Sequence, residues 1–529
     1  MKDNRRFPTL PALLLLALVP AAVIGARSTG APSPMATYAE ILSIIESRHV
    51  PEAPARDVIY SSIDGMLATL DPHTNFLDDE VYREMREEQR GQFYGLGIVI
   101  SKRGKYEPLR VVAPIDDTPA ARLGIRAGDV ITHIRDERAG VDVDTLGLTI
   151  QESVKYLRGP RGTTVEITID RAGLAEPLVL RIVRDAVRTP AVNQAYEIAP
   201  GVAYVKIANF AETTMAELDR ALERLGDQGA HALLLDLRNN PGGLLDQAVG
   251  VSSRFLQPGE LVVYTEGRQP GSRQDYEALD NVPRIDWPVV VLVDRGSASA
   301  SEIVAGALQD HDRALIVGQT TFGKGLVQSV YPLSEGTGLA LTTQKYYTPA
   351  GRSIQRPYDS EERYYYQDVD DEPQGPPENA PPYRTDLGRT VFGGGGIAPD
   401  VVVAPERAPE VLVRLRGESA FSRFVDPRSE SERAAWEQDP DALFAAFRAF
   451  VAREFPDVDQ AALEAARGQA LDLLLAEIAL TRGGLAARDR VLLERDPVVR
   501  RALEALPDAK SLLARRKVLR ENRAALRQR

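Results

Sequence analysis

Three closely spaced serines are the first residues whose types and positions suggest a chemical role. The segment Gly296–Glu302 has the sequence Gly-Ser-Ala-Ser-Ala-Ser-Glu and lies between the apolar run Val289–Val293 and an apolar helical pattern. A strand-to-helix turn of small residues can hold a serine hydroxyl outward and aim the next backbone N–H at an oxyanion. Ser299 and Glu302 also have the spacing of a helix capping box. From this segment alone, capping and catalysis are both open as roles for Ser299.

A lysine 25 residues further on, Lys324, is the residue that could activate such a serine. The histidines of the chain are scattered singly, and none is suitably placed to serve as the base. A lysine can accept the serine proton if desolvation lowers its pKa toward neutrality. The sequence neighbours of Lys324 are glycine, phenylalanine, leucine and valine, with no nearby carboxylate. A solvated lysine in a loop is the alternative interpretation.

The same region contains an incomplete phosphate-binding pattern. Residues 318–324 match the G-x-x-x-x-G-K part of a nucleotide-binding loop. However, Gly325 stands where Mg²⁺ needs a serine or threonine hydroxyl, and 326–333 has a strand pattern where that motif requires a helix. The glycine run 393–396 is excluded in a similar way, because a strand pattern at 401–403 follows it. A nucleotide-binding protein is therefore the least favoured interpretation.

The composition of the chain excludes several classes of protein. Its 529 residues suffice for two to four domains, and 43% apolar and 26% charged residues are typical of a globular protein. The net charge of −12 argues against nucleic acid as a partner, since binding phosphates requires clustered lysine and arginine. There is no cysteine, and the five histidines lack ligand spacing. We therefore expect neither a metal site nor a cofactor.

The N-terminus has the pattern of an export signal. Basic residues within the first six positions precede an apolar stretch from Leu10 to Val23. A basic segment before a short apolar one is typical of a secretory signal peptide or signal anchor, which we place at 1–26. The stretch is too short, and too often interrupted by proline, to predict a spanning helix. Cleavage and anchoring are both open, and export is expected in either case.

Four further regions differ in the periodicity of their apolar residues. Residues 35–90 have a helical pattern, and 93–185 alternate in strand fashion around one short amphipathic helix. From 186 to 403 strands and helices alternate, which predicts an α/β layer with a buried sheet. An insert at 358–382, with eight acidic residues and five prolines, is expected to be a mobile, solvated loop. Residues 404–529 are helical, so the predicted fold class is multidomain α/β.

Eight segments of the chain occur together in a characteristic order. They are 65–74 (GMLATLDPHT), 95–98 (GLGI), 127–131 (AGDVI), 235–243 (LDLRNNPGG), 296–303 (GSASASEI), 322–325 (FGKG), 346–355 (YYTPAGRSIQ) and 393–400 (GGGGIAPD). In these segments the sequence resembles the carboxyl-terminal processing peptidases, also called tail-specific proteases, from about residue 35 to 403. The resemblance implies an N-terminal helical region, a PDZ domain at 93–185, an α/β peptidase core of crotonase-like ββα type at 186–403 and a helical C-terminal extension.

This resemblance assigns roles to three side chains. It implies that Ser299 is the nucleophile, that Lys324 is the general base and that Gln328 orients Lys324. Because Lys324 and Gln328 are four residues apart, they need a local turn or a bulge to meet. The periodicity of the sequence does not show such an irregularity.

The resemblance also implies an oxyanion hole. It would be formed by the backbone N–H of Ala300 and that of Gly242 or Gly243, although the Pro-Gly-Gly segment equally fits a plain turn after a strand. Asp310 falls where some members of the family have a functional aspartate, but it equally fits the end of a helix. His311 beside it is expected to be a surface residue rather than part of a Ser-His-Asp triad.

The module at 93–185 contains a loop that would bind the end of a peptide. In a PDZ domain, the backbone N–H groups of Gly95, Leu96, Gly97 and Ile98 would bind the terminal carboxylate, and 98–100 would pair with the peptide as an added strand. A structural turn is the alternative, since any strand can begin with Gly-x-Gly. Three apolar residues of the short helix fit a groove lining and a core position equally well: Ile150, Val154 and Leu157.

The predicted function is that of an exported serine endopeptidase in the bacterial periplasm or at the outer face of the inner membrane. It would recognise protein substrates by exposed, apolar C-termini and cleave them through an acyl-enzyme. An inactive scaffold that binds tails without cutting is the alternative, and an adaptor protein is a further candidate partner.

The helices beyond residue 403 are expected to be an association element outside the catalytic unit. Their leucine and phenylalanine stripes must pack on the protease or on a partner chain. Residues 507–529 hold eight basic and two acidic side chains, a local charge of +6. This end is predicted to join subunits into a homo-oligomer or to bind an anionic membrane surface, with a solvated charged end as the alternative.

Overall fold

The computed structural model describes residues 33–51, 54–102, 105–171, 173–358, 364, 380–404 and 407–527. The expected export signal and nearly all of the acidic insert lie outside these residues. The chain divides into two compact units, Met1–Asp71 and Pro72–Arg529, which are described one after the other. Among the helices in the described ranges, none combines the length and the apolar character that crossing a bilayer requires.

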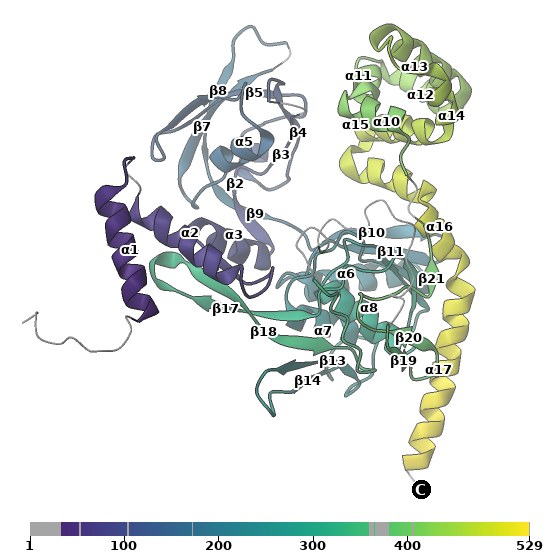
Figure 1. Cartoon of the computed structure of the whole chain (residues 1–529). Helices are drawn as coiled ribbons and strands as arrows, with labels where there is room; N and C mark the ends of the chain where they lie inside the picture. The colour runs from purple at the N-terminus through teal and green to yellow at the C-terminus, as the bar shows by residue number, and fades with distance from the viewer. Residues whose placement is uncertain are drawn as a thin grey trace, which may run out of the picture. The chain divides into compact units, whose positions relative to one another are not determined.

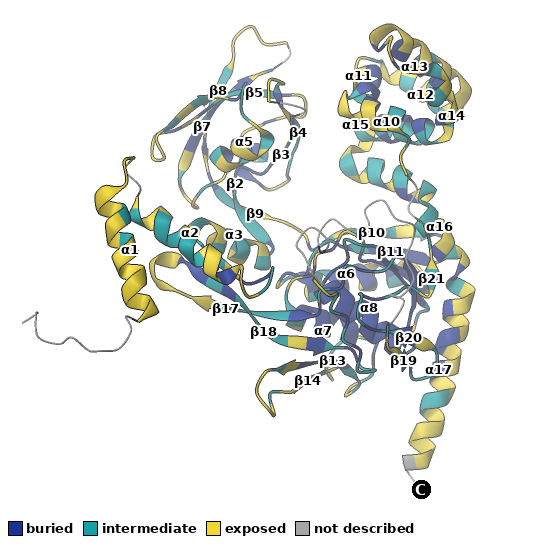
Figure 2. Cartoon of the chain, viewed as in Figure 1, coloured by how far each residue is buried: buried dark blue, intermediate teal, exposed yellow. Residues whose placement is uncertain are grey.

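Two helices make up the described part of the first unit. They are α1 (Pro34–Arg48) and α2 (Ala55–Leu67), in agreement with the helical pattern of this region. The hydroxyl groups of Tyr38 in α1 and Ser62 in α2 lie 2.5 Å apart. No residue of α1 is buried, as its yellow colour in Figure 2 shows.

The centre of the second unit is a six-stranded sheet with the strand order β10-β11-β12-β15-β16-β21 (Figure 1). Its strands are β10 (Val192–Ala199), β11 (Val202–Ile207), β12 (Ala232–Asp236), β15 (Val289–Val293), β16 (Leu315–Gly318) and β21 (Val401–Val402). β10 is antiparallel to β11, and all other neighbouring pairs are parallel. Parallel strands end at the same edge of a sheet, so the loops after β12 and β15 come together there.

Helices cover both faces of this sheet, which is why the inner strands β12 and β15 are buried at every position and almost wholly apolar. In β12, Leu233 and Leu235 belong to one core cluster and Leu234 to the other, because successive side chains point to opposite faces. Residues of α6 (Thr214–Asp227), α7 (Leu245–Ser253) and α8 (Ala300–Asp310) pack in the first cluster. Residues of α16 (Pro497–Glu504) and α17 (Leu506–Arg527) pack in the second.

A second sheet carries the segment that follows Lys324. β18 (Gly338–Tyr347) pairs antiparallel with β1 (Asn75–Leu77), β13 (Leu261–Gly267) and β17 (Leu326–Pro332), and β13 also pairs with β14 (Gln274–Glu277). A short 3₁₀ turn, Ser334–Gly336, joins β17 to β18. β19 (Pro382–Arg384) and β20 (Thr390–Phe392) form a separate pair. Through β1, the start of the second unit reaches β18, more than 250 residues further along the chain.

The β-rich module has its own sheet and core. The sheet has the order β3-β4-β5-β7-β8 with β6 paired to β5, and its strands are β3 (Ile98–Ser101), β4 (Leu109–Pro114), β5 (Val130–Asp136), β6 (Val141–Asp144), β7 (Thr164–Asp170) and β8 (Leu178–Val183). β2 (Gln92–Gly95) pairs with β9 (Asp185–Arg188) where the chain enters and leaves the module, and α3 (Asp79–Gln89) precedes it. The expected amphipathic helix is α5 (Ile150–Leu157), and a four-residue helix, α4 (Pro119–Arg122), is an addition to the prediction.

The helices from α10 to the first part of α15 form a bundle with its own core. They are α10 (Glu410–Gly417), α11 (Ala420–Val425), α12 (Glu430–Gln438), α13 (Pro440–Glu454), α14 (Gln460–Ala465) and α15 (Arg467–Arg495). Stacked aromatic rings fill this core, with centroids 4.9 Å apart for Phe421 and Phe447 and 4.8 Å apart for Phe424 and Trp436. Gly484, with φ 66° and ψ −161°, interrupts α15 beyond the bundle.

The last two helices decide between the two packing partners that the sequence left open for the stripes of residues 404–529, the protease and a partner chain. Ala502, Ala509 and Leu512 are buried in the same cluster as Tyr204 and Leu234 of the central sheet. These helices therefore pack on the protease and cover the second face of its central sheet. The physical reason is that the second apolar face of the sheet has to be covered.

The basic side chains of α17 pair with acidic groups of the same chain. Arg516 and Arg520 pair with Glu260, Arg523 with Asp386 and Lys517 with Asp286. Four of the basic groups that were expected to attract a membrane or a second subunit are thus matched within the chain.

Candidate active site

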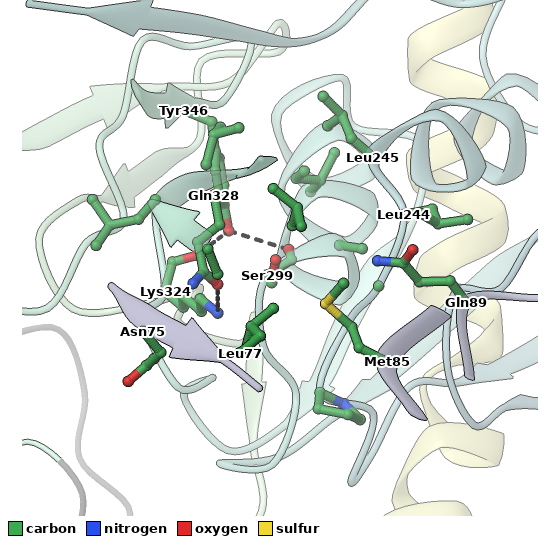
Figure 3. Close-up of a pocket in the computed structure, with 18 residues that line it drawn as sticks. Asn75, Leu77, Met85, Gln89, Leu244, Leu245, Ser299, Lys324, Gln328 and Tyr346 are labelled. Carbon is green, nitrogen blue, oxygen red and sulfur yellow. Dashed lines mark hydrogen bonds between the residues drawn. The ribbon is translucent and has the colours of Figure 1, made fainter. Parts of the chain in front are cut away.

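Of the three serines between β15 and α8, Ser299 is the one that lines a cavity. Ser297 and Ser301 are fully buried, and their hydroxyls donate to the carbonyl oxygens of Leu237 at 2.8 Å and Asn240 at 2.9 Å. These two hydrogen bonds fasten the serine turn to the loop after β12. Ser299, between them, lines a cavity of about 420 Å³ (Figure 3).

The backbone at Ser299 has a conformation that L-residues rarely adopt. Its φ is 55° and its ψ is −112°, immediately before α8. Such a residue costs on the order of 1–3 kcal/mol and persists only where its surroundings impose it. Glu302 does so, because its carboxylate accepts the Ser299 N–H at 2.8 Å while its own N–H donates to the Ser299 carbonyl at 2.9 Å. The two roles that the sequence left open thus coexist: Glu302 caps the helix, and Ser299 lines the cavity.

Glu302 also ties Ser299 to the loop that carries Lys324. The Glu302 side chain is fully buried, and its two oxygens accept four hydrogen bonds of 2.6–2.9 Å. The donors are the N–H groups of Ser299, Gly323 and Lys324 and the hydroxyl of Thr321. Desolvation raises the pKa of Glu302 above its ordinary value, although these donors oppose the effect. The carboxylate therefore holds both loops at a fixed separation.

Lys324 lines the same cavity, and its Nζ donates to Oε1 of Gln328 at 2.7 Å (Figure 3). The pairing of β17 with β18 shifts register between Val327 and Gln328, a local irregularity of the kind that the four-residue spacing requires. On its other side, Gln328 Nε2 donates to the carbonyl oxygen of His73 at 2.5 Å. Because a lysine only donates and a carbonyl only accepts, the amide of Gln328 has one orientation here.

A buried tyrosine connects the serine and lysine loops a second time. The hydroxyl of Tyr346, on β18, lies 3.1 Å from the Ser299 carbonyl oxygen and also contacts that of Lys324 (Figure 3). Burial raises the pKa of Tyr346 well above its ordinary value, so the hydroxyl stays a donor. Sequence reasoning missed Tyr346, His73 and the wider role of Glu302. All three belong to the segments that carried the family resemblance, which is the signal that could have found them.

The loop after β12 brings two glycines against the start of α8. A Cβ atom at Gly242 would lie only 2.8 Å from that of Ser299, so no side chain fits. The Gly242 N–H donates to Oδ1 of Asn240 at 2.9 Å and is therefore occupied. Gly243 and Ala300 line the cavity, and within the described part of the chain their N–H groups donate to no protein acceptor. Of the two glycines expected in an oxyanion hole, the geometry favours Gly243.

The wall of the cavity around these polar groups is mainly apolar. β1 supplies Asn75 and Leu77, and α3 supplies Met85 and Gln89 (Figure 3). The other apolar lining residues are Pro241, Leu244, Leu245, Ile303, Leu326, Val327, Val330 and Ala340. Such a wall can accept apolar side chains of a peptide next to the reacting bond.

Asp310 is the last residue of α8, at the opposite end of the helix from Ser299. It is eleven positions after Ser299 in the sequence, which is about 16 Å along a helix. Its carboxylate pairs with the buried Arg352 at 2.5 Å and accepts the N–H of Ala350 at 2.9 Å. These contacts anchor the loop after β18, and they do not place Asp310 among the groups that line the cavity.

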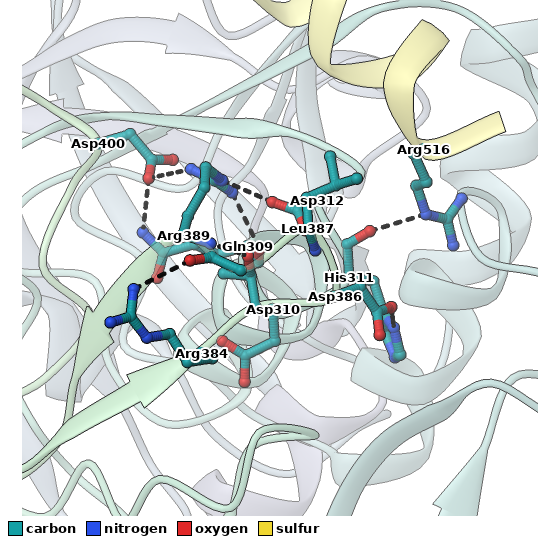
Figure 4. A network of polar contacts seen from close by, with 12 residues as sticks. Gln309, Asp310, His311, Asp312, Arg384, Asp386, Leu387, Arg389, Asp400 and Arg516 are labelled. Carbon is teal, nitrogen blue, oxygen red and sulfur yellow. Dashed lines mark hydrogen bonds and ion pairs between the residues drawn. The ribbon is translucent and has the colours of Figure 1, made fainter. Parts of the chain in front are cut away.

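His311 differs from the expected surface residue. Its side chain is only 12% exposed, and Nδ1 lies 2.8 Å from a carboxylate oxygen of Asp386 (Figure 4). Its Nε2 lies 2.8 Å from the carbonyl oxygen of Leu261. Because both ring nitrogens are occupied by these acceptors, His311 does not serve a catalytic serine.

The loop expected to bind a terminal carboxylate precedes β3 in the β-rich module. Gly97 has φ +78°, and a Cβ there would lie 2.2 Å from Thr118, so this position requires glycine. Leu96 is buried in the module core, and Gly95 ends β2. β3, which begins at Ile98, is a terminal strand, and its second edge is unpaired among the described residues. A free strand edge beside such a loop is what peptide binding by strand addition requires.

The apolar residues of α5 divide between the two roles that the sequence left open. Leu157 is buried in the core of the module. Ile150 and Val154 are half-buried. These two stay candidates for lining a peptide groove.

The nucleotide-binding alternative has no support in the structure. Gly318 ends β16, and the next element is the strand β17 rather than the helix that a phosphate loop requires. The N–H groups of Gly323 and Lys324, which would face a phosphate, donate to Glu302. Within the described ranges, no group of three or more histidine and acidic side chains could hold a metal ion.

The geometry of the cavity suits acyl transfer. A hydroxyl can attack a carbonyl carbon there, a lysine amine can move the proton, and two N–H groups can bind the resulting oxyanion. Together with a module that offers a strand edge to a peptide, this fold and cavity define a serine peptidase.

Comparison with known proteins identifies the family. Residues 201–359 match peptidase family S41, and residues 110–171 match the PDZ domain. The chain is 41% identical over 325 residues to the carboxy-terminal-processing protease of Bartonella bacilliformis, covering 61% of this chain and 72% of that protein. It is 39% identical over 305 residues to the carboxyl-terminal-processing protease of Synechocystis sp., covering 57% and 69%. The chain belongs to the carboxyl-terminal-processing proteases of peptidase family S41.

A solved structure is also similar to the chain. The photosystem II D1 C-terminal processing protease is 30% identical, with a TM-score of 0.37 over 69% of this chain and 87% of that one. The predicted family, the predicted fold class and the predicted enzyme class, a serine-type peptidase, are confirmed.

Proposed function

We propose that the chain cleaves peptide bonds with a Ser–Lys dyad, in which Ser299 is the nucleophile and Lys324 the general base. One observation carries this proposal: Ser299, the one serine of its turn that lines the cavity, shares that cavity with a lysine whose Nζ is held by Gln328 at 2.7 Å. The N–H groups of Ala300 and Gly243 form the proposed oxyanion hole.

In the proposed reaction, the neutral amine of Lys324 accepts the proton of Ser299 as Oγ bonds to the carbonyl carbon of the scissile peptide. The electron pair of the carbonyl moves to oxygen, where the N–H groups of Ala300 and Gly243 stabilise the charge. The C–N bond then breaks, Lys324 returns the proton to the leaving amine, and an ester with Ser299 remains. Water attacks this ester with Lys324 again as the base, which releases the carboxylate product and restores Ser299.

Gln328 suits this reaction because it is a neutral acceptor. It orients the amine of Lys324 through Oε1 without adding a negative charge. A carboxylate in its place would favour the ammonium form and oppose proton transfer from Ser299.

We further propose that the PDZ domain binds the C-terminal tail of a protein substrate. The loop 95–98 would bind the terminal carboxylate, and the free edge of β3 would pair with the tail. The apolar cavity wall supports a preference for apolar side chains. The proposal further includes export to the periplasm or to the outer face of the inner membrane. It also includes an adaptor protein and association of copies through the C-terminal helices. Cell fractionation and light scattering test the export and the association.

Replacing Ser299 by Ala is expected to abolish cleavage of an unstructured protein with an apolar C-terminus, followed on a gel. The fold should survive, because the change removes one hydroxyl that faces the cavity and leaves the backbone contacts of Ser299 with Glu302 in place. Ser297→Ala and Ser301→Ala are the matched comparisons, since each removes a buried hydroxyl that fastens the turn and does not face the cavity; both should lose less activity than Ser299→Ala. Wild-type turnover by Ser299→Ala would refute the proposed nucleophile.

Lys324→Ala and Lys324→Arg are both expected to be inactive. Arginine stays protonated at any working pH and cannot accept the serine proton. The wild-type rate should also rise with pH as Lys324 loses its proton, which a pH profile of kcat/KM measures. An active arginine variant would contradict the dyad.

A further inference from the structure

The segment Pro72–Leu77 reaches the catalytic residues, although the proposed mechanism does not use it. His73 lies two residues before β1, and its side chain is buried. Its backbone carbonyl oxygen accepts hydrogen bonds from Nε2 of Gln328 at 2.5 Å and from Nδ2 of Asn75 at 2.9 Å. Both lone pairs of that oxygen are therefore used, and the position of the His73 peptide is coupled to that of Gln328.

The orientation of the Gln328 amide depends on this carbonyl group. If the amide turned over, its NH₂ would face the Lys324 amine and its oxygen would face the His73 carbonyl. One donor would then face another donor on the lysine side, and one acceptor would face another acceptor on the His73 side. Because the site is half-buried, both hydrogen bonds of the Gln328 amide would be lost. The His73 carbonyl thus selects the orientation in which Oε1 faces Lys324.

The side chain of His73 holds that carbonyl in place. Its Nε2 lies 2.8 Å from the hydroxyl of Tyr364, and the two rings meet edge to face with centroids 5.4 Å apart. Tyr364 is buried and packs edge to face on Phe322, two residues before Lys324, at 5.3 Å. The contacts therefore form a closed path from Lys324 through Gln328, His73, Tyr364 and Phe322 back to the lysine loop.

We propose that His73 is a positioning residue for the catalytic base, which it aligns by holding Gln328 in the one productive amide orientation. The inference rests on the proposed Ser–Lys mechanism and extends it to a segment 255 residues away from Gln328 in the sequence. Among the described residues that line the cavity, His73 is absent, so it acts through Gln328 and not on the substrate.

A double-mutant cycle tests this role. His73→Ala and Gln328→Ala should each lower kcat on the order of 10²-fold, the cost of a small misplacement of a catalytic group. KM should change by no more than about twofold, because neither change removes the apolar wall. The variant with both changes should be no slower than Gln328→Ala alone, since residues that act as a unit are not additive. Multiplied losses in the double variant would overturn the proposal.

Two milder variants separate positioning from folding. His73→Gln keeps a side-chain nitrogen that can reach the Tyr364 hydroxyl and should recover most of the activity. Tyr364→Phe removes only that hydroxyl and should lower kcat in the same direction; it replaces His73→Ala in the cycle if that variant does not fold. His231→Ala, at an exposed histidine before β12, is the control and should keep wild-type kcat.

The outcomes distinguish this inference from the proposed function. An active Ser299→Ala variant would refute the Ser–Lys mechanism itself. An inactive Ser299→Ala together with a fully active His73→Ala would refute only the positioning role.

Discussion

The two oxygens of Glu302 hold the nucleophile and base loops together, because each of them accepts two hydrogen bonds. Glu302→Gln replaces one oxygen by an NH₂ group, so one buried pair of donors loses its acceptor. Each orphaned donor costs about 1–3 kcal/mol, and the free energy of unfolding should fall by about 2–6 kcal/mol with loss of cleavage. Urea unfolding and a peptide-cleavage assay measure the two effects.

Glu223→Gln, at an exposed position of α6, is the matched control and should change neither the stability nor the cleavage. Unchanged stability of Glu302→Gln would show that the carboxylate does not bridge the loops.

At the scale of secondary-structure elements, α17 is part of the α/β core. Leu512 in this helix is 5% exposed and packs on the central sheet, whereas Leu526 in the same helix is 71% exposed. Leu512→Ala should lower the free energy of unfolding by about 2–5 kcal/mol, because it leaves a cavity between the helix and the sheet. Leu526→Ala removes the same atoms from solvent-exposed surface and should cost no more than about 0.5 kcal/mol. Urea unfolding compares the two variants, and equal small effects would mean that α17 does not pack on the sheet.

At the scale of the whole molecule, the contacts of His311 join α8, β13, the segment at Asp386 and α17 (Figure 4). Desolvation by itself would lower the pKa of His311. The Asp386 carboxylate, the Leu261 carbonyl and Glu260 have the larger, opposite effect, so the pKa of His311 lies above its ordinary value. Burial opposes the shift at Asp386, yet His311 and Arg523 lower its pKa to about 2.

The stabilising contribution of this contact should therefore depend on pH in two ways. The part from His311 is complete below about pH 6.5 and is lost as the pH rises through the raised pKa. The part from Asp386 is complete above about pH 3.9 and is lost as the pH falls toward the lowered pKa. Thermal unfolding of the wild type and of His311→Gln from about pH 5 to about pH 9 tests the first part. The difference in Tm should shrink as the pH rises, and a constant difference would contradict the linkage.

Local residue types determined much of the fold and the two principal site residues. The apolar run Val289–Val293 is the strand β15, and the predicted strand 326–333 is β17 (Leu326–Pro332). The first of these is readable because β15 is buried at every position, and a strand buried on both faces is apolar throughout. Ser299 and Lys324 became candidates because few residue types can act as nucleophile and base, and the family resemblance then assigned their roles.

Contacts between distant segments were decided by the tertiary structure. The apolar stripe of α17 predicted that this helix is buried on one face. A hydrophobic face can pack against any apolar surface, so the sequence did not show whether α17 packs on a second subunit or on the central sheet. The sequence likewise marked Glu302 as a helix cap without showing its hold on the loop 321–324. His73 reaches Gln328 across 255 residues through a backbone carbonyl. Every residue has a carbonyl group, so its hydrogen-bond partners follow from the fold and not from the residue type.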